Sequence, residues 1–292
     1  MVLAIELRDL TRAFSPNTGV FGLNLKVERG RIFSFVGPNG SGKTTTIRLL
    51  LDYLHPNAGS AILLGLDSRR NAIEIRRHIG YLPGEFRLYE GETGWGLLRY
   101  LASFRPKGCF ERACQLAERL NAKLDGHIRR YSKGMKQKVM VIQALMHDPE
   151  LLILDEPTEG FDPRMQQEFH QMLLEARNRG RTIFLSSHVL SEVEQICDEV
   201  GIIREGKLRG IERMAELQAR YPRILNLNLS EDLPDEAIAL PDARLRDRSG
   251  RHLSYAFSGR TSELLQALSS VPIADFTLEP PRLEDIFLEY YA

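Results

Sequence analysis

The segment from Gly37 to Thr45 contains the residues best suited to bind phosphate groups. It reads Gly-Pro-Asn-Gly-Ser-Gly-Lys-Thr-Thr and directly follows the apolar run Ile32–Val36. Glycines let the backbone turn tightly, so that successive N–H groups converge on an anion. The positive end of a following helix adds to this attraction. The spacing Gly-x-x-x-x-Gly-Lys-Ser/Thr between a strand and a helix is that of a P-loop, which binds nucleotide phosphates.

The polar side chains of this P-loop have separate predicted roles. Lys43 is expected to reach the β- and γ-phosphates of a nucleotide, and the Thr44 hydroxyl to bind Mg²⁺. The predicted nucleotide-binding residues of the segment are Gly37, Asn39, Gly40, Ser41, Gly42, Lys43, Thr44 and Thr45.

A pair of acidic residues, Asp155 and Glu156, follows the apolar run Leu151–Leu154, which is typical of a buried strand. A carboxylate at the end of such a strand lies at the edge of a parallel sheet where ligands bind. Asp155 is suited there to hold Mg²⁺, and Glu156 to accept a proton from an attacking water. An ordinary strand with a solvated acidic turn is the alternative. It would be favoured if no P-loop preceded the pair.

Residues 131–138 form a weaker candidate for an anion site. The run Tyr-Ser-Lys-Gly-Met-Lys-Gln-Lys puts Ser132 where a helix N-cap is expected, with the helix continuing to Met146. A helix start with a serine hydroxyl and a flexible glycine, here Gly134, can bind an anion. The same residues also fit a plain capped helix with a basic first turn. The residues alone leave both interpretations open.

The elements expected around these motifs alternate between strands and helices. In chain order we expect short β-segments at 4–7, 23–27 and 31–36, a helix at 42–54, helices within 94–121, a strand at 151–154, a helix at 163–177, a strand at 182–185 and a helix at 190–197. This order predicts an α/β fold in which helices cover both faces of a mostly parallel sheet.

The sequence pattern changes after Gly206. Apolar residues alternate at 224–230 and 252–257, and a helix is expected at 261–268. Polar turns separate these pieces, and the pair Pro280-Pro281 precedes a last amphipathic helix predicted at 283–291.

Two domains follow from this change of pattern. We predict a nucleotide-binding domain at 1–210 and a small accessory α+β domain at 211–292, joined through a linker near 206–220.

The composition excludes several classes of protein. The 292 residues include 39 basic and 39 acidic side chains, a balance that gives no general attraction to nucleic acid. The three cysteines lack metal-ligand spacing and are typical of reduced packing residues in a cytosolic protein. No apolar run approaches the roughly 18 residues of a membrane span. The first residues reach a charge at Glu6 too early for a signal peptide.

In this order the motifs resemble those of the ATPase domain of ABC transporters, and the likeness covers residues 1 to about 210. Residues 131–135 resemble the signature Leu-Ser-Gly-Gly-Gln of that family. Ser132 and Gly134 are kept, whereas Lys133 and Met135 depart from it. The run Ser-Lys-Gly-Met-Lys-Gln is similar to a variant common among exporter ATPases.

Three shorter matches accompany the signature. Gly160-Phe161-Asp162 resembles the D-loop of the family, and Ser186-Ser187-His188 resembles the segment with the switch histidine. Phe14 stands where these proteins carry an aromatic residue that stacks on adenine. The tail of the chain resembles the C-terminal extension of drug- and ion-exporter ATPases.

The resemblance implies a P-loop ABC ATPase core with an antiparallel β-segment and a helical subdomain at about 85–150, with ATP and Mg²⁺ as cofactors. The implied catalytic residues are Glu156, His188 and Lys43; ATP would also contact Phe14, Ser132 and Gly134; Thr44 and Asp155 would hold Mg²⁺.

One position departs from the family pattern in a way that bears on coupling. Residues 79–83 resemble the start of the Q-loop, whose next residue is usually a metal-contacting glutamine. Here Gly84 stands at that position and Glu85 follows it. We expect either that Glu85 substitutes through a water or that the site senses the γ-phosphate differently.

The resemblance also implies partners. Two copies would face head to tail with ATP between them, so that Ser132 and Gly134 of one copy complete the site of the other. A homodimer is expected, together with a separate transmembrane permease subunit and no nucleic acid. The chain would be cytoplasmic, peripheral on the cytoplasmic face of the cell membrane. Phe86 and Leu88, flanked by charges, are expected to contact that permease.

Two alternatives stay open at this point. The first is an ABC ATPase without a membrane partner, although such proteins commonly have paired cassettes, coiled coils or zinc modules, which this chain lacks. The second is a regulatory module that binds ATP without hydrolysing it. The pair Asp155-Glu156 and His188 argue against this second alternative, whereas Gly84 and Met135 leave it open.

Overall fold

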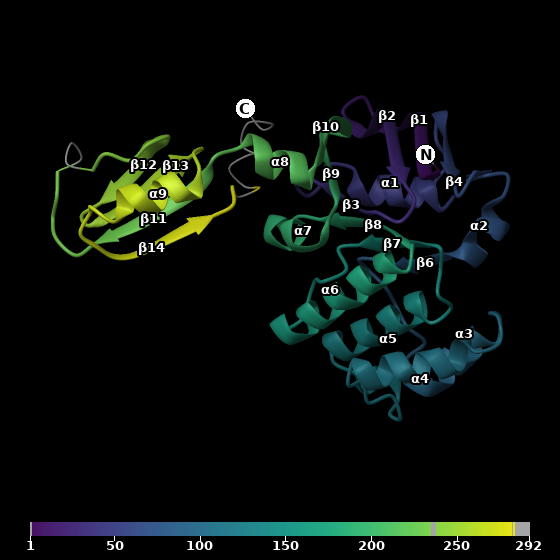
Figure 1. Cartoon of the computed structure of the whole chain (residues 1–292). Coiled ribbons are helices and arrows are strands. Elements are labelled where there is room, and N and C mark those ends of the chain that lie inside the picture. Colours follow the sequence, from purple (N-terminus) through teal and green to yellow (C-terminus); the bar gives the residue numbers. More distant parts are fainter. Residues whose placement is uncertain (1, 235–237, 282, 284–292) are drawn as a thin grey trace. The chain divides into compact units, whose positions relative to one another are not determined.

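The computed structural model describes residues 2–234, 238–281 and 283. The chain divides into two compact units, Met1–Ile211 and Glu212–Ala292 (Figure 1). Of the last predicted helix, at 283–291, all but Leu283 lies outside the described residues.

A six-stranded sheet forms the centre of the first unit, in the order β10-β9-β3-β8-β7-β6. Its strands are β3 (Ile32–Val36), β6 (Ile79–Leu82), β7 (Leu151–Asp155), β8 (Thr182–Ser187), β9 (Glu199–Arg204) and β10 (Lys207–Arg213). The pairs β3–β8, β3–β9, β7–β8 and β6–β7 are parallel. Strands β3, β7 and β8 are buried along their whole length, as expected for apolar strands covered on both faces. The predicted mostly parallel sheet is confirmed.

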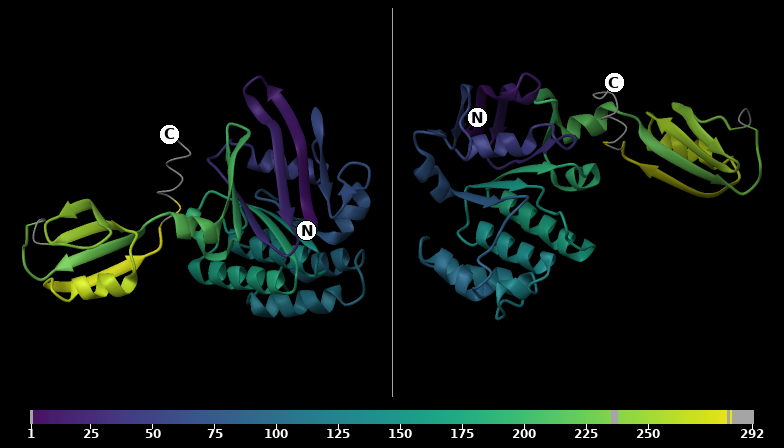
Figure 2. Two further views of the ribbon diagram at one scale, coloured as in Figure 1. Left: turned by 45° about the horizontal axis from the view of Figure 1, so that its top comes forward. Right: turned by 180° about the vertical axis from the view of Figure 1, so that it is seen from behind.

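A second sheet of four strands, in the order β2-β1-β4-β5, is antiparallel. Its strands are β1 (Leu3–Ser15), β2 (Thr18–Glu28), β4 (Ala58–Leu63) and β5 (Leu66–Asp67). Strands β1 and β2 form a long hairpin, drawn in purple in Figure 2, where two short segments at 4–7 and 23–27 were expected. One hydrophobic cluster joins residues of this sheet, of the parallel sheet and of helix α1 (Lys43–Leu50).

Helix α1 ends earlier than predicted, at Leu50 instead of Leu54. The reason is a Schellman motif, which satisfies the last carbonyl groups of the helix. Asp52 has a left-handed φ of 57°. The N–H groups of Asp52 and Tyr53 donate to the carbonyl oxygens of Leu49 and Arg48, at 3.3 and 2.8 Å.

The other helices of the first unit are α2 (Ala72–His78), α3 (Gly94–Ala102), α4 (Cys109–Arg119), the 3₁₀ turn η1 (Ile128–Arg130), α5 (Lys133–Leu145), α6 (Pro163–Asn178) and α7 (Leu190–Ile196). Ser132 caps α5 as predicted, because its side chain accepts a hydrogen bond from Met135 N. Asp162 caps α6, and Pro163 takes the first helical position, where its missing N–H costs nothing. Helices α3, α4 and α5 form one group in Figure 1.

The second unit is a four-stranded antiparallel sheet with a helix on one face. Its elements are α8 (Met214–Arg220), β11 (Arg223–Leu229), β12 (Ala243–Ser249), β13 (His252–Phe257), α9 (Thr261–Leu268) and β14 (Ile273–Glu279). Leu264 and Leu268 of α9 pack on the alternating leucines of β11 and on β13. The expected helix at 261–268 and the expected strands of this part are present.

The predicted linker near 206–220 is instead regular structure. Strand β10 and helix α8 occupy it, and β10 pairs with β9 at the edge of the parallel sheet. The exposure of β10 alternates along Lys207–Arg213. A charged edge strand of this kind has too few apolar residues to give a clear strand pattern in the sequence.

Candidate functional site

The P-loop connects β3 to helix α1 with the backbone geometry that the glycines predict. Gly40 and Gly42 have φ angles of 79° and 110°, in the left-handed region that side chains avoid. Gly42 has a second constraint, since a Cβ there would lie 2.7 Å from Val20 Cγ1 of strand β2. The adjacent strand therefore fixes the loop as tightly as its own dihedral angles do.

The side chain of Lys43 is folded into the loop. Its Nζ donates to Gly37 O at 2.6 Å and to Pro38 O at 3.3 Å. The same ammonium lies 3.3 Å from Glu156 Oε1, and only 7% of the Lys43 side chain is exposed. The structure thus holds the one basic side chain of the loop against the first glycine of the motif and against Glu156.

Asp155 lies at the end of β7, next to the P-loop. Thr44 Oγ1 donates to Asp155 Oδ1 at 3.2 Å, and Ser186 Oγ donates to the same oxygen at 2.6 Å. Burial, with the negative charge of Asp155 as the next cause, raises the pKa of Tyr81 to about 12. The Asp155 carboxylate therefore has two hydroxyl donors and a neutral tyrosine around it.

Glu156 and His188 form the outer part of the cluster. His188 Nδ1 lies 2.8 Å from Glu156 Oε2, while the other carboxylate oxygen faces Lys43. Glu156 N donates to Ser186 Oγ at 3.0 Å. Glu156 has a φ of 47°, an uncommon value for a residue with a side chain, and such strain concentrates at functional sites. The strained backbone directs the carboxylate toward both a lysine and a histidine.

The donor set fits a nucleoside triphosphate with Mg²⁺. Ser41 is buried, and its Oγ makes no hydrogen bond to any described residue, so a donor remains for a phosphate oxygen. No cluster of three or more His, Cys, Asp or Glu suited to a metal occurs among residues 2–234, 238–281 and 283. Mg²⁺ typically binds through one or two protein ligands plus phosphate oxygens and water. Thr44 and Asp155 match that smaller set.

The remaining predicted residues lie on other elements. Phe14 is on β1 and is 53% exposed, with the Arg12 guanidinium 5.3 Å from its ring centre. Its neighbour Ala13 pairs with Gly19, and Gly19–Val20 is the part of β2 that touches Gly42. Phe14 is therefore at the end of the hairpin that borders the P-loop.

Ser132 and Gly134 are at the start of α5. Within the described part of the chain, no hydrogen bond or ion pair joins either residue to the P-loop of the same copy. Lys133, between them, forms an exposed ion pair with Glu159 at 2.9 Å. The segment around Ser132 is thus bonded to Glu159, just before Gly160, and is separate from the Lys43 cluster.

Ser186 is a site residue that the sequence analysis missed. It contacts both Asp155 and Glu156 because Asp155 and Ser186 are partners in the parallel pair β7–β8. Strand ends that meet at one sheet edge are a signal that could have identified it, once the strand order was known. The local sequence patterns do not predict that strand order.

Gly84 lies directly against Asp155. A Cβ at position 84 would be 3.2 Å from Asp155 O and 3.7 Å from Asp155 Oδ2. Its side chain would therefore start beside the carboxylate proposed to bind Mg²⁺, with a shift of a few tenths of an ångström needed to admit the Cβ. The glycine leaves this flank of Asp155 without a side chain.

We expect Gly84→Gln to change ATPase activity by less than about tenfold, because an amide there adds one contact to a site whose ligands are already present. Steady-state ATP hydrolysis by the purified protein checks this. Gly84→Ala is the matched control, since it adds the Cβ without the amide. Complete loss in Gly84→Gln would contradict the expectation. If Gly84→Ala were lost as well, the glycine would have a role of its own, whereas a near-normal Gly84→Ala would assign the loss to the added amide.

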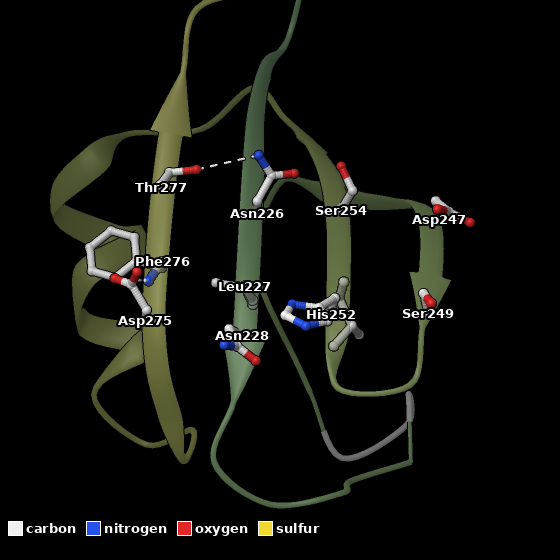
Figure 3. A pocket seen from close by; sticks show the side chains of 11 residues that line it. Asn226, Leu227, Asn228, Asp247, Ser249, His252, Ser254, Asp275, Phe276 and Thr277 are labelled. Carbon is white, nitrogen blue, oxygen red and sulfur yellow. Dashed lines mark hydrogen bonds between the residues drawn. The ribbon is translucent and has the colours of Figure 1, made fainter.

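The second unit has a hollow of its own on the sheet face opposite α9. It measures about 410 Å³ and is lined by polar side chains from all four strands (Figure 3). Asn226 Nδ2 donates to Thr277 Oγ1 across β11 and β14. Asp247, His252 and Asp275 are exposed on this face. Exposed polar side chains therefore share the lining of this hollow with Leu227, Leu253 and Phe276, whereas Lys43 of the P-loop is buried.

Comparison with known proteins gives a consistent result. A sequence model described as "ABC transporter" matches residues 20–159. The chain is 33% identical to the bacitracin transport ATP-binding protein BcrA of Bacillus licheniformis, over 99% of this chain and 97% of that protein. It is 30% identical to the Nod factor export ATP-binding protein I of Cupriavidus metallidurans, over 99% and 97% of the two chains.

A solved structure of an ATP-binding subunit of an ABC transporter is similar in fold. It has a TM-score of 0.69 and 28% sequence identity, covering 74% of this chain and 92% of that chain. The structure of cbiO1 from Clostridium perfringens, described as part of the transporter complex cbiONQ, has a TM-score of 0.63 and 25% identity, covering 75% and 92%.

Proposed function

The chain belongs to the ABC transporter family as an ATP-binding subunit with the ABC ATPase fold, and from this premise we propose that it hydrolyses ATP to power export through a separate membrane-spanning subunit. The observation that carries the proposal is the arrangement of side chains at the P-loop: Glu156 contacts Lys43 at 3.3 Å and His188 at 2.8 Å. Beside them, Asp155 accepts a hydrogen bond from Thr44 at 3.2 Å. Phosphoryl transfer needs mainly positioning and charge stabilisation, and these side chains supply both.

Each side chain has one task in this proposal. Lys43 and the backbone N–H groups of the loop bind the phosphates of ATP. Glu156 accepts the proton of the attacking water, and His188, 2.8 Å from its Oε2, holds that carboxylate in orientation. Ser186 Oγ accepts from the Glu156 backbone N–H, which keeps the backbone at the catalytic carboxylate in place.

Thr44 and Asp155 are the proposed protein ligands of Mg²⁺. Their oxygens are already 3.2 Å apart, on helix α1 and at the end of strand β7. The ion supplies charge neutralisation on the transferred phosphoryl group. Ser186 Oγ is hydrogen bonded to Asp155 Oδ1 and orients this carboxylate.

A head-to-tail homodimer completes the site in this proposal. Ser132 and Gly134 have no hydrogen bond or ion pair to the P-loop of their own copy within the described residues, and helix α5 begins with an N-terminus suited to an anion. We place them against the γ-phosphate bound by the second copy. Hydrolysis then depends on closure of the two copies, which couples it to a mechanical change.

The membrane component would be another chain. No helix among residues 2–234, 238–281 and 283 is both long and apolar enough to cross a membrane. We therefore propose a cytoplasmic subunit, peripheral at the membrane, with Phe86 and Leu88 at its contact with the permease. Both side chains are half-buried, and the neighbouring Tyr89 is 72% exposed. Trp95 is half-buried and packs edge-on against Phe110 of the helical part.

Export is the direction that the relatives favour. One is named for bacitracin transport and another for Nod factor export, and each aligns with almost the whole of this chain. The substrate path belongs to the permease, so the proposal for this chain is the class of transporter and not the compound carried.

A pull-down of the tagged chain from detergent-solubilised native membranes tests the proposal. A multispan membrane protein is expected among the recovered proteins, and Phe86→Ala with Leu88→Ala should reduce its recovery by about tenfold, as loss of two apolar contact residues predicts. Tyr53→Ala, an exposed aromatic outside this segment, is the control. Recovery of soluble proteins or nucleic acid alone would contradict the transporter proposal.

A further inference from the structure

The segment after Glu156, residues 157–162, is held from two sides. Gln137 of α5 is buried and donates from Nε2 to Pro157 O at 3.2 Å. Thr158 Oγ1 donates to Glu192 Oε2 of α7 at 2.6 Å. The segment that directly follows the proposed catalytic carboxylate is therefore fixed to two different helices.

Glu192 is the centre of a small, mostly buried polar cluster. Only 14% of its side chain is exposed. Gln166 Nε2 of α6 donates to Oε1, and His170 Nε2, on the same helix, lies 3.8 Å from Oε2. Burial alone would raise the pKa of Glu192, but the contacts from His170, Thr158 and Gln166 outweigh it and lower the pKa. A carboxylate buried in this way is costly unless every partner is in place.

The positions of the two bonded residues explain what the cluster can do. Thr158 is two residues after Glu156, and Glu192 is four residues after His188. Glu156 and His188 are themselves in contact at 2.8 Å. The Thr158–Glu192 hydrogen bond is thus a second connection between the same two chain segments. It joins residues that follow Glu156 and His188 by two and four positions.

We propose that Glu192 is a positioning residue for hydrolysis, which fixes the distance between Glu156 and His188 by tying Thr158 to helix α7. The inference rests on the proposed ATPase function and deepens it. The hydrogen bonds and the ion pair given for Glu192 join it to Thr158, Gln166 and His170, none of which is in the P-loop. It acts through Thr158 on one side and through α7 on the other, with Gln166 and His170 holding its carboxylate in one orientation.

Glu192→Gln is the first test, because it keeps the size of the side chain and removes one of two acceptor oxygens. We expect kcat for ATP to fall on the order of 10- to 100-fold, the loss typical of misplacing a reacting group by a fraction of an ångström. The KM for ATP and the affinity for a fluorescent ATP analogue should stay within about threefold, since the P-loop is untouched. Glu118→Gln is the matched control, because it replaces an exposed carboxylate on α4 by a carboxamide.

Thr158 supplies an independent variant pair for the case in which Glu192→Gln folds poorly. Thr158→Val removes the hydroxyl at nearly constant shape and should lower kcat as Glu192→Gln does, whereas Thr158→Ser should retain most of it. The double variant Thr158→Val with Glu192→Gln should be no worse than the more impaired single variant, because both break the same bond. Additive losses in the double variant would show that the two single variants do not act through the Thr158–Glu192 hydrogen bond.

The outcomes separate this inference from the proposed function. If the wild-type transporter does not hydrolyse ATP, the proposed function fails first. If it does, and Thr158→Val and Glu192→Gln both retain wild-type kcat, the positioning role is overturned while the ATPase proposal stands. A fall in melting temperature with unchanged kcat per nucleotide-binding subunit would also overturn it, since that result describes a structural residue only.

Discussion

Glu156→Gln is expected to lower ATP hydrolysis by at least about a hundredfold while ATP binding is retained, the loss typical when a general base is removed. The glutamine has nearly the same shape, so it still fits between Lys43 Nζ at 3.3 Å and His188 Nδ1 at 2.8 Å. It can no longer accept the proton of the attacking water. Phosphate release measured in the assembled transporter and ATP affinity measured on the purified subunit check the two halves of this expectation.

The same variant tests the dimer. If closure needs bound ATP and is released by hydrolysis, Glu156→Gln should elute as a dimer in ATP and as a monomer without nucleotide. Adding Ser132→Arg, a bulky cation at the N-terminus of α5, should abolish this dimer without changing ATP affinity for the P-loop. Glu74→Gln, on the exposed face of α2, is the carboxylate control. Wild-type turnover in Glu156→Gln would exclude Glu156 as the base.

Lys43→Met is expected to have the second large effect, on binding as well as on turnover. The ammonium is the only side-chain cation within the P-loop, and it is almost fully buried. Removing a preorganised charge from such a site costs about a hundredfold or more in rate. Here ATP affinity should fall too, because the lysine would contact ground-state phosphates as well as the transition state. Nucleotide binding by fluorescence and steady-state hydrolysis are the measurements.

The pairing of Lys43 with Glu156 gives this variant a second readout. Without the ammonium, the mostly buried carboxylate of Glu156 loses its lysine partner, so the nucleotide-free variant should have a lower melting temperature. Combining Lys43→Met with Glu156→Gln removes that charge and should recover most of the lost stability, although not the activity. Lys26→Met, on the exposed side of β2, is the matched control. Unchanged ATP affinity in Lys43→Met would show that the lysine does not bind the phosphates of ATP.

The central part of the fold could be predicted from local patterns, for physical reasons. Strand β7 is a run of leucine and isoleucine with no polar residue before Asp155, which is what burial on both faces requires. Ser132 and Asp162 have side chains that cap the following helices, and both helices begin within one residue of those caps. Patterns of this kind depend on neighbouring residues only.

Predictions failed where the pattern was polar or where the end of an element depended on the backbone. Strand β10 alternates between exposed and half-buried residues, so its pairing with β9 has no apolar signature. Helix α1 ends at Leu50 because Asp52 adopts a left-handed φ, although no glycine or proline marks that position. Asparagine and aspartate enter that region at a modest cost, which makes such an ending hard to recognise.

The sequence by itself determined which chemistry is available: a phosphate-binding loop, a carboxylate pair after a buried strand, and a capped helix with Ser132 and Gly134. Only the tertiary structure decided which groups meet. Parallel pairing of β7 with β8 brings Ser186 to Asp155, and the packing of α7 brings His188 to Glu156 and Glu192 to Thr158. Residues 30 or more positions apart have no local rule that relates them. Their contacts follow from strand order and helix packing, which the whole chain sets together.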